Sequence, residues 1–402
     1  MSQPTTLPAE WIVALRDCLP PARLDETRGT PVCRPESDAE WAEVLRTATR
    51  FDAKVLVRGG DTKNGERPSP DRADLILETT SDAGVVRYEP GDGVVTARAG
   101  TRLGELRAVV AKGGHHLSPW LPRPEGTLGG TLAAGRSGPD RLRFGPLRHH
   151  VLGAKIAFGD GTVTSSGGAL VKNVTGYDLF RLWTGSFGAF GILLEVSLRL
   201  FPKPDVTERA GFRSSSRAQA LELGRALARI EHAPLAVEVR GIEDGPFLLE
   251  VVQAGTREVV DAAWNETRTL AGELEAAPLP DDWIREPDSD DCLRITARPG
   301  DLERVLASFE RRVAVKPKQI LVRPGIGEAL LGFHRHTDDL EAVEAELAVL
   351  PGEFSWRRAS DRVLRRAQTR EALAPGFALM RQLKKRYDPG ERFAPGRFFG
   401  AL

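Results

Sequence analysis

The chain has 402 residues, 41% of them hydrophobic, and its 56 Lys and Arg residues balance 56 Asp and Glu residues. The length predicts two domains, and the lack of a basic excess argues against a nucleic-acid-binding protein. No apolar run approaches the roughly 18 residues of a membrane-spanning helix, and the N-terminus lacks a secretory signal pattern. We therefore expect a soluble, cytoplasmic protein that acts on small molecules.

The three cysteines, Cys18, Cys33 and Cys292, lie far apart in the sequence. This spacing excludes a disulfide framework, and it excludes a zinc or iron–sulfur site with four thiolates from this chain alone. Any iron–sulfur chemistry would need a partner chain.

The first predicted element is a helix over residues 37–51. Ser37 and Glu40 have the spacing of a capping box. Apolar residues recur on one face of this helix: Trp41, Val44, Leu45 and Ala48. A short apolar run, residues 54–57, then predicts a strand that ends at Arg58.

Three more strands are predicted at residues 73–80, 84–90 and 93–100, and the last two form a pair joined by a turn at residues 91–93. A helix over residues 101–114 follows. Thr101 is its predicted N-cap, and Gly113 is its predicted end.

The glycine-rich stretch RGGDTKNG directly follows the first predicted strand. Peptide groups around Gly59, Gly60 and Asp61 can turn consecutive N–H groups toward one anion, while Thr62 and Lys63 add a hydroxyl and a positive charge. The chain has no GxGxxG motif and no GK dipeptide, which excludes a Rossmann fingerprint and a P-loop. The stretch therefore predicts a different kind of phosphate site, suited to a pyrophosphate.

Two further glycine-dense segments lie at residues 124–163 and 172–202, each beside an apolar strand. Glycine is costly to order, so its density indicates that backbone approaches a ligand or another backbone closely. Tight turns alone explain a single cluster, but three clusters favour a large cofactor that carries phosphate.

Four segments occur in an order typical of one family: RGGDTKNG, GTLGGTLAAGRSG, KNVTGYDLFRLWTGSFGAFGILLEVSL and DPGERFAPGR. Through them the sequence resembles the flavoproteins with a PCMH-type FAD-binding domain, the vanillyl-alcohol oxidase superfamily, and especially the FAD-binding accessory subunits of bacterial glycolate oxidases. The resemblance implies an α+β fold, in which a two-subdomain FAD-binding domain is joined to a cap with an antiparallel sheet covered by helices. The implied division is an N-terminal extension (1–30), the FAD-binding domain (31–204), the cap (205–375) and a C-terminal segment that packs on the FAD-binding domain (376–402).

The resemblance also assigns residues to parts of FAD. The pyrophosphate loop would be Arg58, Gly59, Gly60, Asp61, Thr62 and Lys63. The second side of the diphosphate and the isoalloxazine would be lined by Thr127, Gly129, Gly130, Ala134, Ser137 and Gly138, with Gly145 after them. The adenine and ribose end would contact Gly188, Gly191 and Ile192. The flavin ring would lie near Lys172, Asn173, Tyr177 and Asp178, and the C-terminus would return through Pro395, Gly396 and Arg397.

Three positions depart from the family pattern. Many relatives have a histidine at the position of Thr62 and attach FAD through it, so FAD is expected to be non-covalent here. His149 follows Arg148 where the family commonly has Asp, and Ala394 stands where Asn is usual. These two changes affect local contacts and leave the predicted fold unchanged.

The predicted cap shows no metal site. Catalytic hydroxy-acid dehydrogenases of the superfamily bind a divalent ion through motifs of the GDGNxH and HGxG type, and neither occurs here. His334 and His336 would share one face of a strand, but no third ligand accompanies them. The adjacent pairs His115/His116 and His149/His150 likewise show no ligand set, so no metal is predicted.

Three functions remain open. The first is an FAD-carrying subunit of a complex that oxidises a small hydroxy acid, together with a homologous catalytic flavoprotein subunit and an iron–sulfur subunit. Any contact with a membrane would be made through these partners. The second is an unaided oxidoreductase acting on an alcohol, sugar or hydroxy acid, with Tyr177, Lys172 or Arg323 as catalytic residues. In this case Arg294, Arg298 or Arg323 could bind a carboxylate. The third is a flavin-binding scaffold without a redox role.

Overall fold

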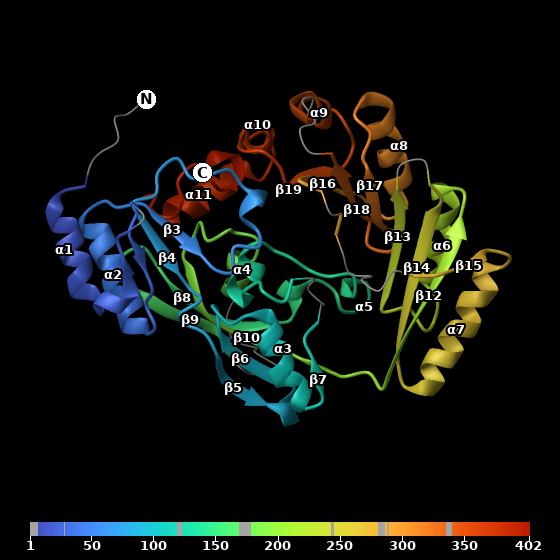
Figure 1. The fold of residues 1–402 in the computed structure, drawn as a ribbon, viewed down its shortest axis with the longest axis horizontal. Coiled ribbons are helices and arrows are strands. Elements are labelled where there is room, and N and C mark those ends of the chain that lie inside the picture. Colours follow the sequence, from blue (N-terminus) through green and yellow to red (C-terminus); the bar gives the residue numbers. More distant parts are fainter. Residues whose placement is uncertain are drawn as a thin grey trace.

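The computed structural model describes residues 7–27, 29–118, 123–168, 178–242, 245–279, 286–287, 289–334 and 340–402. Figure 1 shows two lobes side by side. The first lobe contains a four-stranded sheet, a five-stranded sheet and a two-stranded pair, and the second contains one eight-stranded sheet. This mixed α and β architecture confirms the predicted fold class.

The first sheet has four strands in the order β1 (Leu24–Asp25), β2 (Val32–Cys33), β4 (Leu75–Glu78) and β3 (Val55–Arg58). The strands β2, β4 and β3 are parallel. Two helices, α1 (Ala9–Cys18) and α2 (Asp38–Arg50), pack against it through a shared core. The predicted first strand and the predicted helix α2 are confirmed, and all four residues of its predicted apolar face are buried.

The capping box of α2 is half formed. The hydroxyl of Ser37 accepts a hydrogen bond from the backbone N–H of Glu40 at 3.3 Å. The carboxylate of Glu40 does not return to Ser37: it accepts from the backbone N–H of Glu36 at 2.8 Å and pairs with Arg23 at 2.6 Å. The ion pair with Arg23 competes for the carboxylate that a complete box would use.

The second sheet is antiparallel, in the order β5 (Val85–Glu89), β6 (Val94–Arg98), β10 (Ile192–Arg199), β8 (Val151–Ala157) and β9 (Val163–Gly167). The predicted pair of β5 and β6 is confirmed. Helix α3 (Leu103–Lys112) packs on this sheet, and the small pair β7 (His115–His116) and β11 (Phe201–Pro202) lies after it. Two short helices, α4 (Leu128–Ala133) and α5 (Arg141–Phe144), follow.

The predicted N-cap of α3 is wrong, whereas its predicted end at Gly113 is confirmed. The N-cap residue is Arg102. The Thr101 hydroxyl lies 2.7 Å from the carbonyl oxygen of Arg98 and accepts from the N–H of Gly84 at 2.8 Å. Because these contacts hold the Thr101 hydroxyl against the backbone of Gly84 and Arg98, the side chain does not cap the first turn of α3.

The sheet of the second lobe is antiparallel throughout. Its strands, in spatial order, are β15 (Glu275–Ala277), β12 (Val206–Ser214), β14 (Phe247–Gly255), β13 (Ala236–Ile242), β17 (Gln319–Arg323), β18 (Glu328–Phe333), β16 (Asp291–Thr296) and β19 (Glu353–Arg358). Its helices are α6 (Arg217–Leu227), α7 (Arg257–Ala271), α8 (Leu302–Arg312) and α9 (Leu340–Leu347). One apolar core joins the sheet to these helices, so the predicted sheet covered by helices is confirmed.

The other face of this sheet carries charges. We call five residues the charged face: Glu238, Glu250, Arg294, Arg323 and Glu328. Four of them are buried, and Arg294 is partly buried. Buried charges are expensive unless paired, and Arg323 accordingly lies 2.8 Å from Glu238 and 2.7 Å from Glu328. The sheet therefore separates an apolar interior from an ionic layer.

The C-terminal part of the chain crosses back to the first lobe. Helix α10 (Asp361–Glu371) packs on the core of the second lobe, and α11 (Phe377–Tyr387) packs on that of the first. The buried Lys384 of α11 donates hydrogen bonds to Asp388 at 2.7 Å and to the carbonyl oxygen of Ala189 at 3.0 Å. The N–H of Ala394 donates to the carbonyl oxygen of Val55 at 2.9 Å, which aligns the end of the chain beside β3.

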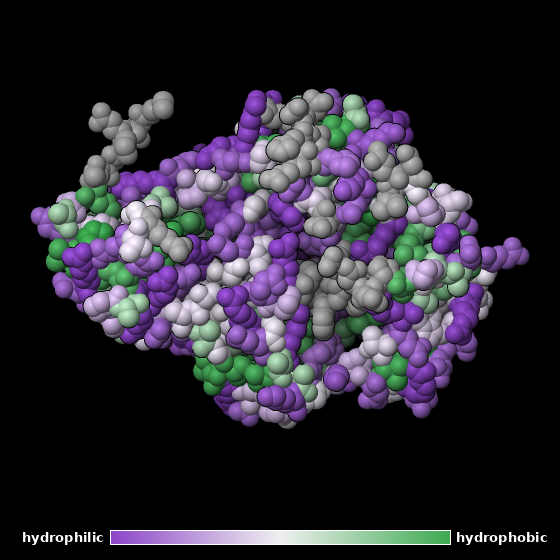
Figure 2. Space-filling view, viewed as in Figure 1, coloured by the Kyte–Doolittle hydropathy of each residue, from purple (hydrophilic) through white to green (hydrophobic). Residues whose placement is uncertain are grey.

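Short 3₁₀ helices lie at Pro21–Arg23 (η1), Asn64–Glu66 (η2), Pro90–Asp92 (η3), Leu147–His149 (η4), Leu179–Trp183 (η5) and Phe399–Ala401 (η6). Among the described residues, no helix is both long and apolar enough to cross a membrane. The face drawn in Figure 2 is mainly hydrophilic, with separate apolar patches over α1 and near β5. Val13 and Val86 are exposed on these two elements.

Candidate functional site

The glycine loop, residues 58–63, leaves the end of β3 and packs directly on the segment before α4. A Cβ atom at Gly59 would lie 2.5 Å from the hydroxyl oxygen of Thr127, and one at Gly60 would lie 2.5 Å from the carbonyl oxygen of Glu125. Both distances are far below a normal contact. Only glycine fits at these two positions. This part of the loop therefore presents backbone atoms, and no side chains, to its surroundings.

Several backbone N–H groups of the glycine loop have no hydrogen-bond partner among the described residues. Asp61 has φ +58°, a left-handed conformation that is uncommon for residues other than glycine. It is held by the side chain of Asn64, which donates to its carboxylate at 2.5 Å. Within the described ranges, the N–H groups of residues 59–61 donate to no other residue. Successive unpaired N–H groups in such a turn are suited to one anion.

Lys63 supplies the positive charge of the loop. Its ammonium group donates to the Thr62 hydroxyl at 2.8 Å, and no ion pair joins it to a described carboxylate. Desolvation by burial lowers the pKa of Lys63 to about 8, although Glu66 acts in the opposite direction. A half-buried ammonium without a carboxylate partner has the environment of a group that binds an anionic ligand.

The segment around α4 forms the opposite wall. Thr127 is the N-cap of this helix and accepts from the N–H of Gly130 at 3.2 Å. A Cβ at Gly129 would lie 2.7 Å from that of Ala99, so glycine there lets the helix pack on the end of β6. Gly129 thus has a packing role as well as its predicted place at the cofactor.

A narrow cavity of about 80 Å³ lies between the two sheets of the first lobe. It brings together six of the predicted cofactor residues: Gly59, Gly129, Gly130, Gly188, Gly191 and Ile192. The indole N–H of Trp183, which also lines it, is buried and has no hydrogen-bond partner among the described residues. Such an orphaned donor indicates a ligand acceptor at this place.

A second cavity, of about 340 Å³, lies where the two lobes meet, and we call it the junction cavity. The predicted residues Ala134 and Ser137 line it from the first lobe, and Arg294 and Arg357 line it from the second. Phe187 lines both cavities, so they adjoin. Gly138 and Gly145 bracket α5, and Gly145 has φ +78° there.

The C-terminus returns to the glycine loop. The guanidinium group of Arg397 donates to the carbonyl oxygen of Asn64 at 3.2 Å, and its Nε atom is buried without a partner among the described residues. A Cβ at Gly396 would lie 2.0 Å from a carboxylate oxygen of Asp71, which explains glycine there. Arg397 thus fixes the far end of the loop.

Two of the three predicted catalytic residues, Tyr177 and Lys172, lie outside the described residues, as does Asn173. Arg323 is described, but both Glu238 and Glu328 engage its guanidinium group, and only 4% of its surface is exposed. Its catalytic assignment stays a prediction, and the structure gives it an ion-pair role within the charged face. Asp178 is exposed and pairs with Arg181 at 2.7 Å.

The sequence did not single out the arginines of the junction cavity, apart from Arg294. Arg136 pairs with Glu66 at 2.8 Å and with Glu286 at 3.1 Å. Arg67 binds both carboxylate oxygens of Glu371 at 2.8 Å. Arg136 lies inside the glycine-dense GTLGGTLAAGRSG segment, which was the one available signal, whereas the pairing partners come from distant parts of the chain.

The histidines serve other contacts. The imidazole Nδ1 of His115 is 2.9 Å from the Tyr88 hydroxyl, and that of His116 is 3.0 Å from the carbonyl oxygen of Pro202. The predicted placement of His334 on a strand is wrong, because β18 ends at Phe333, where the backbone pairing with β16 stops. His336 lies outside the described residues.

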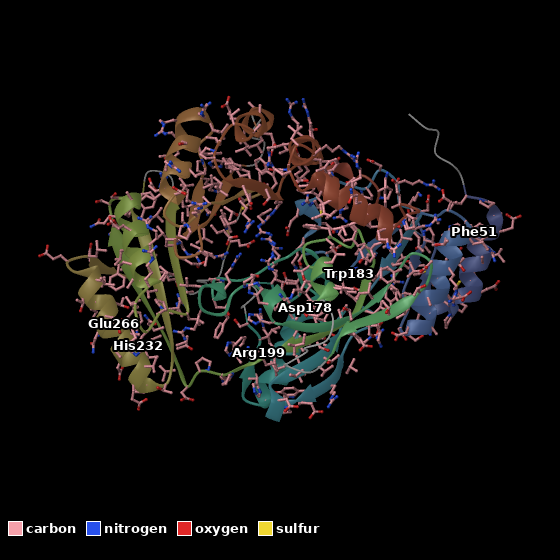
Figure 3. All side chains as sticks on the ribbon, turned by 180° about the vertical axis from the view of Figure 1, so that it is seen from behind. Phe51, Asp178, Trp183, Arg199, His232 and Glu266 are labelled. Carbon is pink, nitrogen blue, oxygen red and sulfur yellow. The ribbon has the colours of Figure 1, made fainter. Side chains whose placement is uncertain are left out.

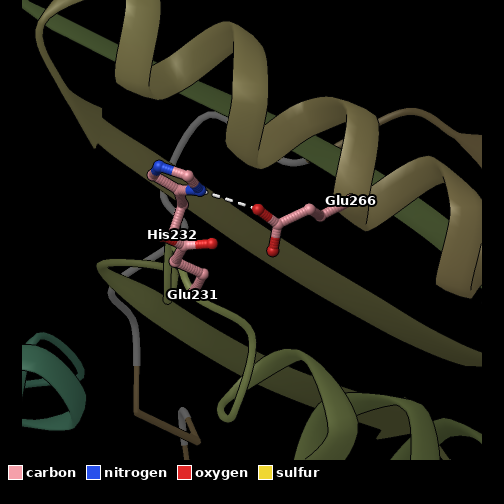
Figure 4. A group of neighbouring side chains, drawn as sticks. All are labelled: Glu231, His232 and Glu266. Atoms are coloured by element: carbon pink, nitrogen blue, oxygen red, sulfur yellow. Dashed lines mark hydrogen bonds and ion pairs between the residues drawn. The ribbon is translucent and has the colours of Figure 1, made fainter.

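One group of side chains has the composition of a metal site: Glu231, His232 and Glu266. In Figure 4 the imidazole of His232 faces Glu266, and the two form a hydrogen bond of 2.7 Å. Figure 3 shows this group at the outer end of the second lobe, far from Trp183 in the first. It therefore plays no part in the site described above.

FAD fits the observed site. Free N–H groups and Lys63 of the glycine loop suit its pyrophosphate, and the narrow cavity offers an unpaired indole donor beside Gly191. Thr62 has no side-chain nitrogen that could form a histidyl bond. The fold and the site together are those of a flavoprotein with a PCMH-type FAD-binding domain.

Comparison with known proteins agrees. The family model of the FAD binding domain matches residues 30–177. The chain is 30% identical to the glycolate oxidase subunit GlcE of Escherichia coli over 328 residues, which is 81% of this chain and 87% of that protein. The chain belongs to this family of FAD-dependent oxidoreductases, and FAD is its cofactor.

Two other relatives match slightly less than half of this chain. The D-lactate dehydrogenase of Archaeoglobus fulgidus is 27% identical over 43% of this chain and 39% of that protein. The mitochondrial D-2-hydroxyglutarate dehydrogenase of Bos taurus is 32% identical over 48% of this chain and 36% of that protein. Among solved structures, an alkyldihydroxyacetonephosphate synthase aligns over 97% of this chain and 85% of that one, with a TM-score of 0.73 and 14% identity, which supports the fold alone.

Proposed function

We propose that the chain is the FAD-binding subunit of a complex that oxidises a small 2-hydroxy acid such as glycolate. The observation that carries the proposal is the extent of the match to GlcE, 328 residues, which is too long to lie within the first lobe alone. The match to the D-lactate dehydrogenase covers 172 residues. The match to GlcE therefore includes part of the second lobe of this chain.

The proposed division follows the lobes. Residues 31–204, with the C-terminal segment 376–402, hold FAD, and residues 205–375 form the cap, while residues 1–30 are an extension whose strand β1 joins the first sheet. The glycine loop holds the pyrophosphate through its N–H groups and Lys63. Gly188, Gly191 and Ile192 receive the adenine and ribose, and Ala134 and Ser137 face the isoalloxazine.

FAD, when bound, accepts a hydride from a carbon that carries a hydroxyl group. The residues of this chain supply positioning: Phe187 lies between the narrow cavity and the junction cavity, and Arg294 of β16 and Arg357 of β19 line the junction cavity from the second lobe. We propose that a homologous catalytic flavoprotein subunit and an iron–sulfur subunit complete the complex, and that any membrane contact is made through them.

The test is to isolate the tagged chain from its own cells and analyse the material. We expect one FAD per chain, two co-purifying partners of the stated kinds, and glycolate or D-lactate oxidation by the complex. Glycolate oxidation at the full rate by the chain without partners would contradict the subunit assignment and favour the unaided oxidoreductase.

A further inference from the structure

The junction cavity has an unbalanced charge. Its lining contains six arginines and two glutamates: Glu66, Arg67, Arg136, Arg141, Arg148, Arg294, Arg357 and Glu371. A volume of about 340 Å³ falls within the range of small-molecule sites. The cavity lies between the connection from α4 to α5 in the first lobe and strands β16 and β19 in the second, so a ligand there would touch both lobes.

Three of these six arginines already have close carboxylate partners. Arg67 pairs with Glu371 at 2.8 Å, and Arg136 pairs with Glu66 at 2.8 Å. Arg294 pairs with Glu328, which lies behind the lining, at 2.5 Å. These guanidinium groups are neutralised by the protein itself.

Arg357 is less completely paired. It approaches Glu66 at 3.5 Å and Glu328 at 3.6 Å, both of which have a closer arginine. Its Nε atom is buried and has no hydrogen-bond partner in the described part of the chain. A donor therefore remains available on the second-lobe side of the cavity.

Arg141 has no ion-pair partner in the part of the chain that the structure describes. Among the described residues it forms no ion pair and no side-chain hydrogen bond, although it lies at the start of α5 and is half-buried. Burial lowers its pKa from the usual value; Glu328 opposes this, and Arg294, Arg323 and Arg148 add to it. Arg148 is also without a described partner, but it is exposed and water screens it.

One half-buried guanidinium group without a counter-ion calls for one negative charge. Its planar fork matches a carboxylate, whose two oxygens accept two parallel hydrogen bonds. A phosphate dianion would bring a second charge, and the other lining arginine without a described partner, Arg148, is exposed, so water screens it. The pyrophosphate of FAD already has the glycine loop and Lys63.

We propose that the junction cavity binds the carboxylate of a small 2-hydroxy or 2-oxo monocarboxylic acid through Arg141, with the guanidinium group of Arg357, which lines the same cavity, as a second donor. This inference rests on the proposed function, because it names the ligand class of the same site. It also gives this chain an acid-binding site built from arginine.

The experiment uses the full-length, FAD-loaded chain, titrated with pyruvate and followed by calorimetry and by the flavin absorbance spectrum. Pyruvate is a 2-oxo acid and gives no electrons to oxidised flavin in this titration. Methyl pyruvate, which lacks the carboxylate charge, and inorganic phosphate are the matched ligands. We expect saturable binding of pyruvate with a shifted flavin spectrum, and at least tenfold weaker binding of the other two.

The variant Arg141→Met should weaken pyruvate binding by about 10- to 100-fold, because it removes a charge-assisted bidentate pair. Arg141→Lys should retain part of the affinity. The control is Arg304→Met, which removes an exposed arginine of α8 in the second lobe that does not line the junction cavity, and it should bind pyruvate like the wild type. FAD content and melting temperature are measured for every variant.

The outcomes separate the two proposals. Equal pyruvate affinity of Arg141→Met and wild type would overturn the inference, as would phosphate binding as tightly as pyruvate. Loss of FAD from a folded Arg141→Met would also overturn it, because the anion at Arg141 would then belong to the cofactor. If the wild type carries FAD and assembles with its partners but binds no pyruvate, only this inference fails; a chain that takes up no FAD contradicts the proposed function itself.

Discussion

The glycine loop and the charged face accommodate charged groups in different ways. The glycine loop uses backbone N–H groups and one lysine, and a Cβ atom at Gly59 or Gly60 would lie only 2.5 Å from a neighbouring oxygen atom, so no side chain fits there. The charged face uses long side chains from five strands, with Arg323 held between two buried glutamates. A backbone site is fixed by a few adjacent residues, whereas an ionic layer is fixed only by the whole sheet.

The largest expected effect is on the charged face. Arg323→Met leaves the carboxylates of Glu238 and Glu328 buried with one fewer partner each. Removing one partner of a buried ion pair costs about 3–5 kcal/mol, so the free energy of unfolding should fall by that amount. Urea unfolding followed by tryptophan fluorescence measures it, with the exposed Arg298→Met as the control. Equal stability of the two variants would show that the charged face is not a structural layer.

The second-largest expected effect concerns Glu250, and it tests whether every carboxyl group of the charged face is ionised at neutral pH. Burial raises the pKa of Glu250 to about 7, although Arg240 lowers it. Because the folded chain holds this proton more tightly than the unfolded chain, stability decreases as pH rises from about 4.5 through 7. The loss is about 3 kcal/mol for this shift.

The variant Glu250→Gln removes the titrating group, so it should unfold at nearly the same urea concentration at pH 5.5 and pH 8. The wild type should lose stability over the same interval. A parallel loss in both proteins would assign the pH dependence to another group.

The third effect concerns the glycine loop. Lys63→Gln should weaken FAD binding by about 10- to 100-fold, since it removes one charged donor to the pyrophosphate. In the FAD-free wild type, Lys63 loses its proton as pH rises through about 8. The affinity of the wild type for FAD should therefore fall above pH 8, and that of Lys63→Gln should not. Fluorescence quenching of added FAD across pH 7–10 distinguishes the two.

The smallest effect is local and lies outside both regions. Ser37→Ala removes the hydroxyl that accepts from the N–H of Glu40 at the start of α2. Loss of an N-cap costs about 1 kcal/mol, and FAD affinity should not change. A change in FAD affinity as large as that of Lys63→Gln would mean that the glycine loop depends on the packing of α2.

The contrast between features fixed by adjacent residues and features fixed by a whole sheet also explains what the sequence could predict. The helix α2, the pair of β5 and β6 and the glycine loop follow from patterns within a dozen residues, and the structure has all three. The N-cap at Thr101 failed because its hydroxyl is used by Arg98 and Gly84. The strand around His334 failed because hydrophobic alternation does not show where strand pairing ends.

The junction cavity could not be predicted from local patterns. Arg141 and Arg357 come from different lobes, and nothing near either residue in sequence indicates that they line one cavity. The role of Arg323 depends on Glu238, which lies on a neighbouring strand but far away in sequence. Sequence periodicity assigns a residue to a face of a strand, and only the sheet order then decides its partner.

The most direct test of the central claim is to denature the purified chain with acid and to identify the flavin. The account predicts a yellow protein that releases one FAD per chain into the supernatant, because Thr62 offers no side-chain nitrogen for a covalent bond at the glycine loop. Flavin that remains with the precipitated protein, or a colourless chain that takes up no added FAD, would contradict it.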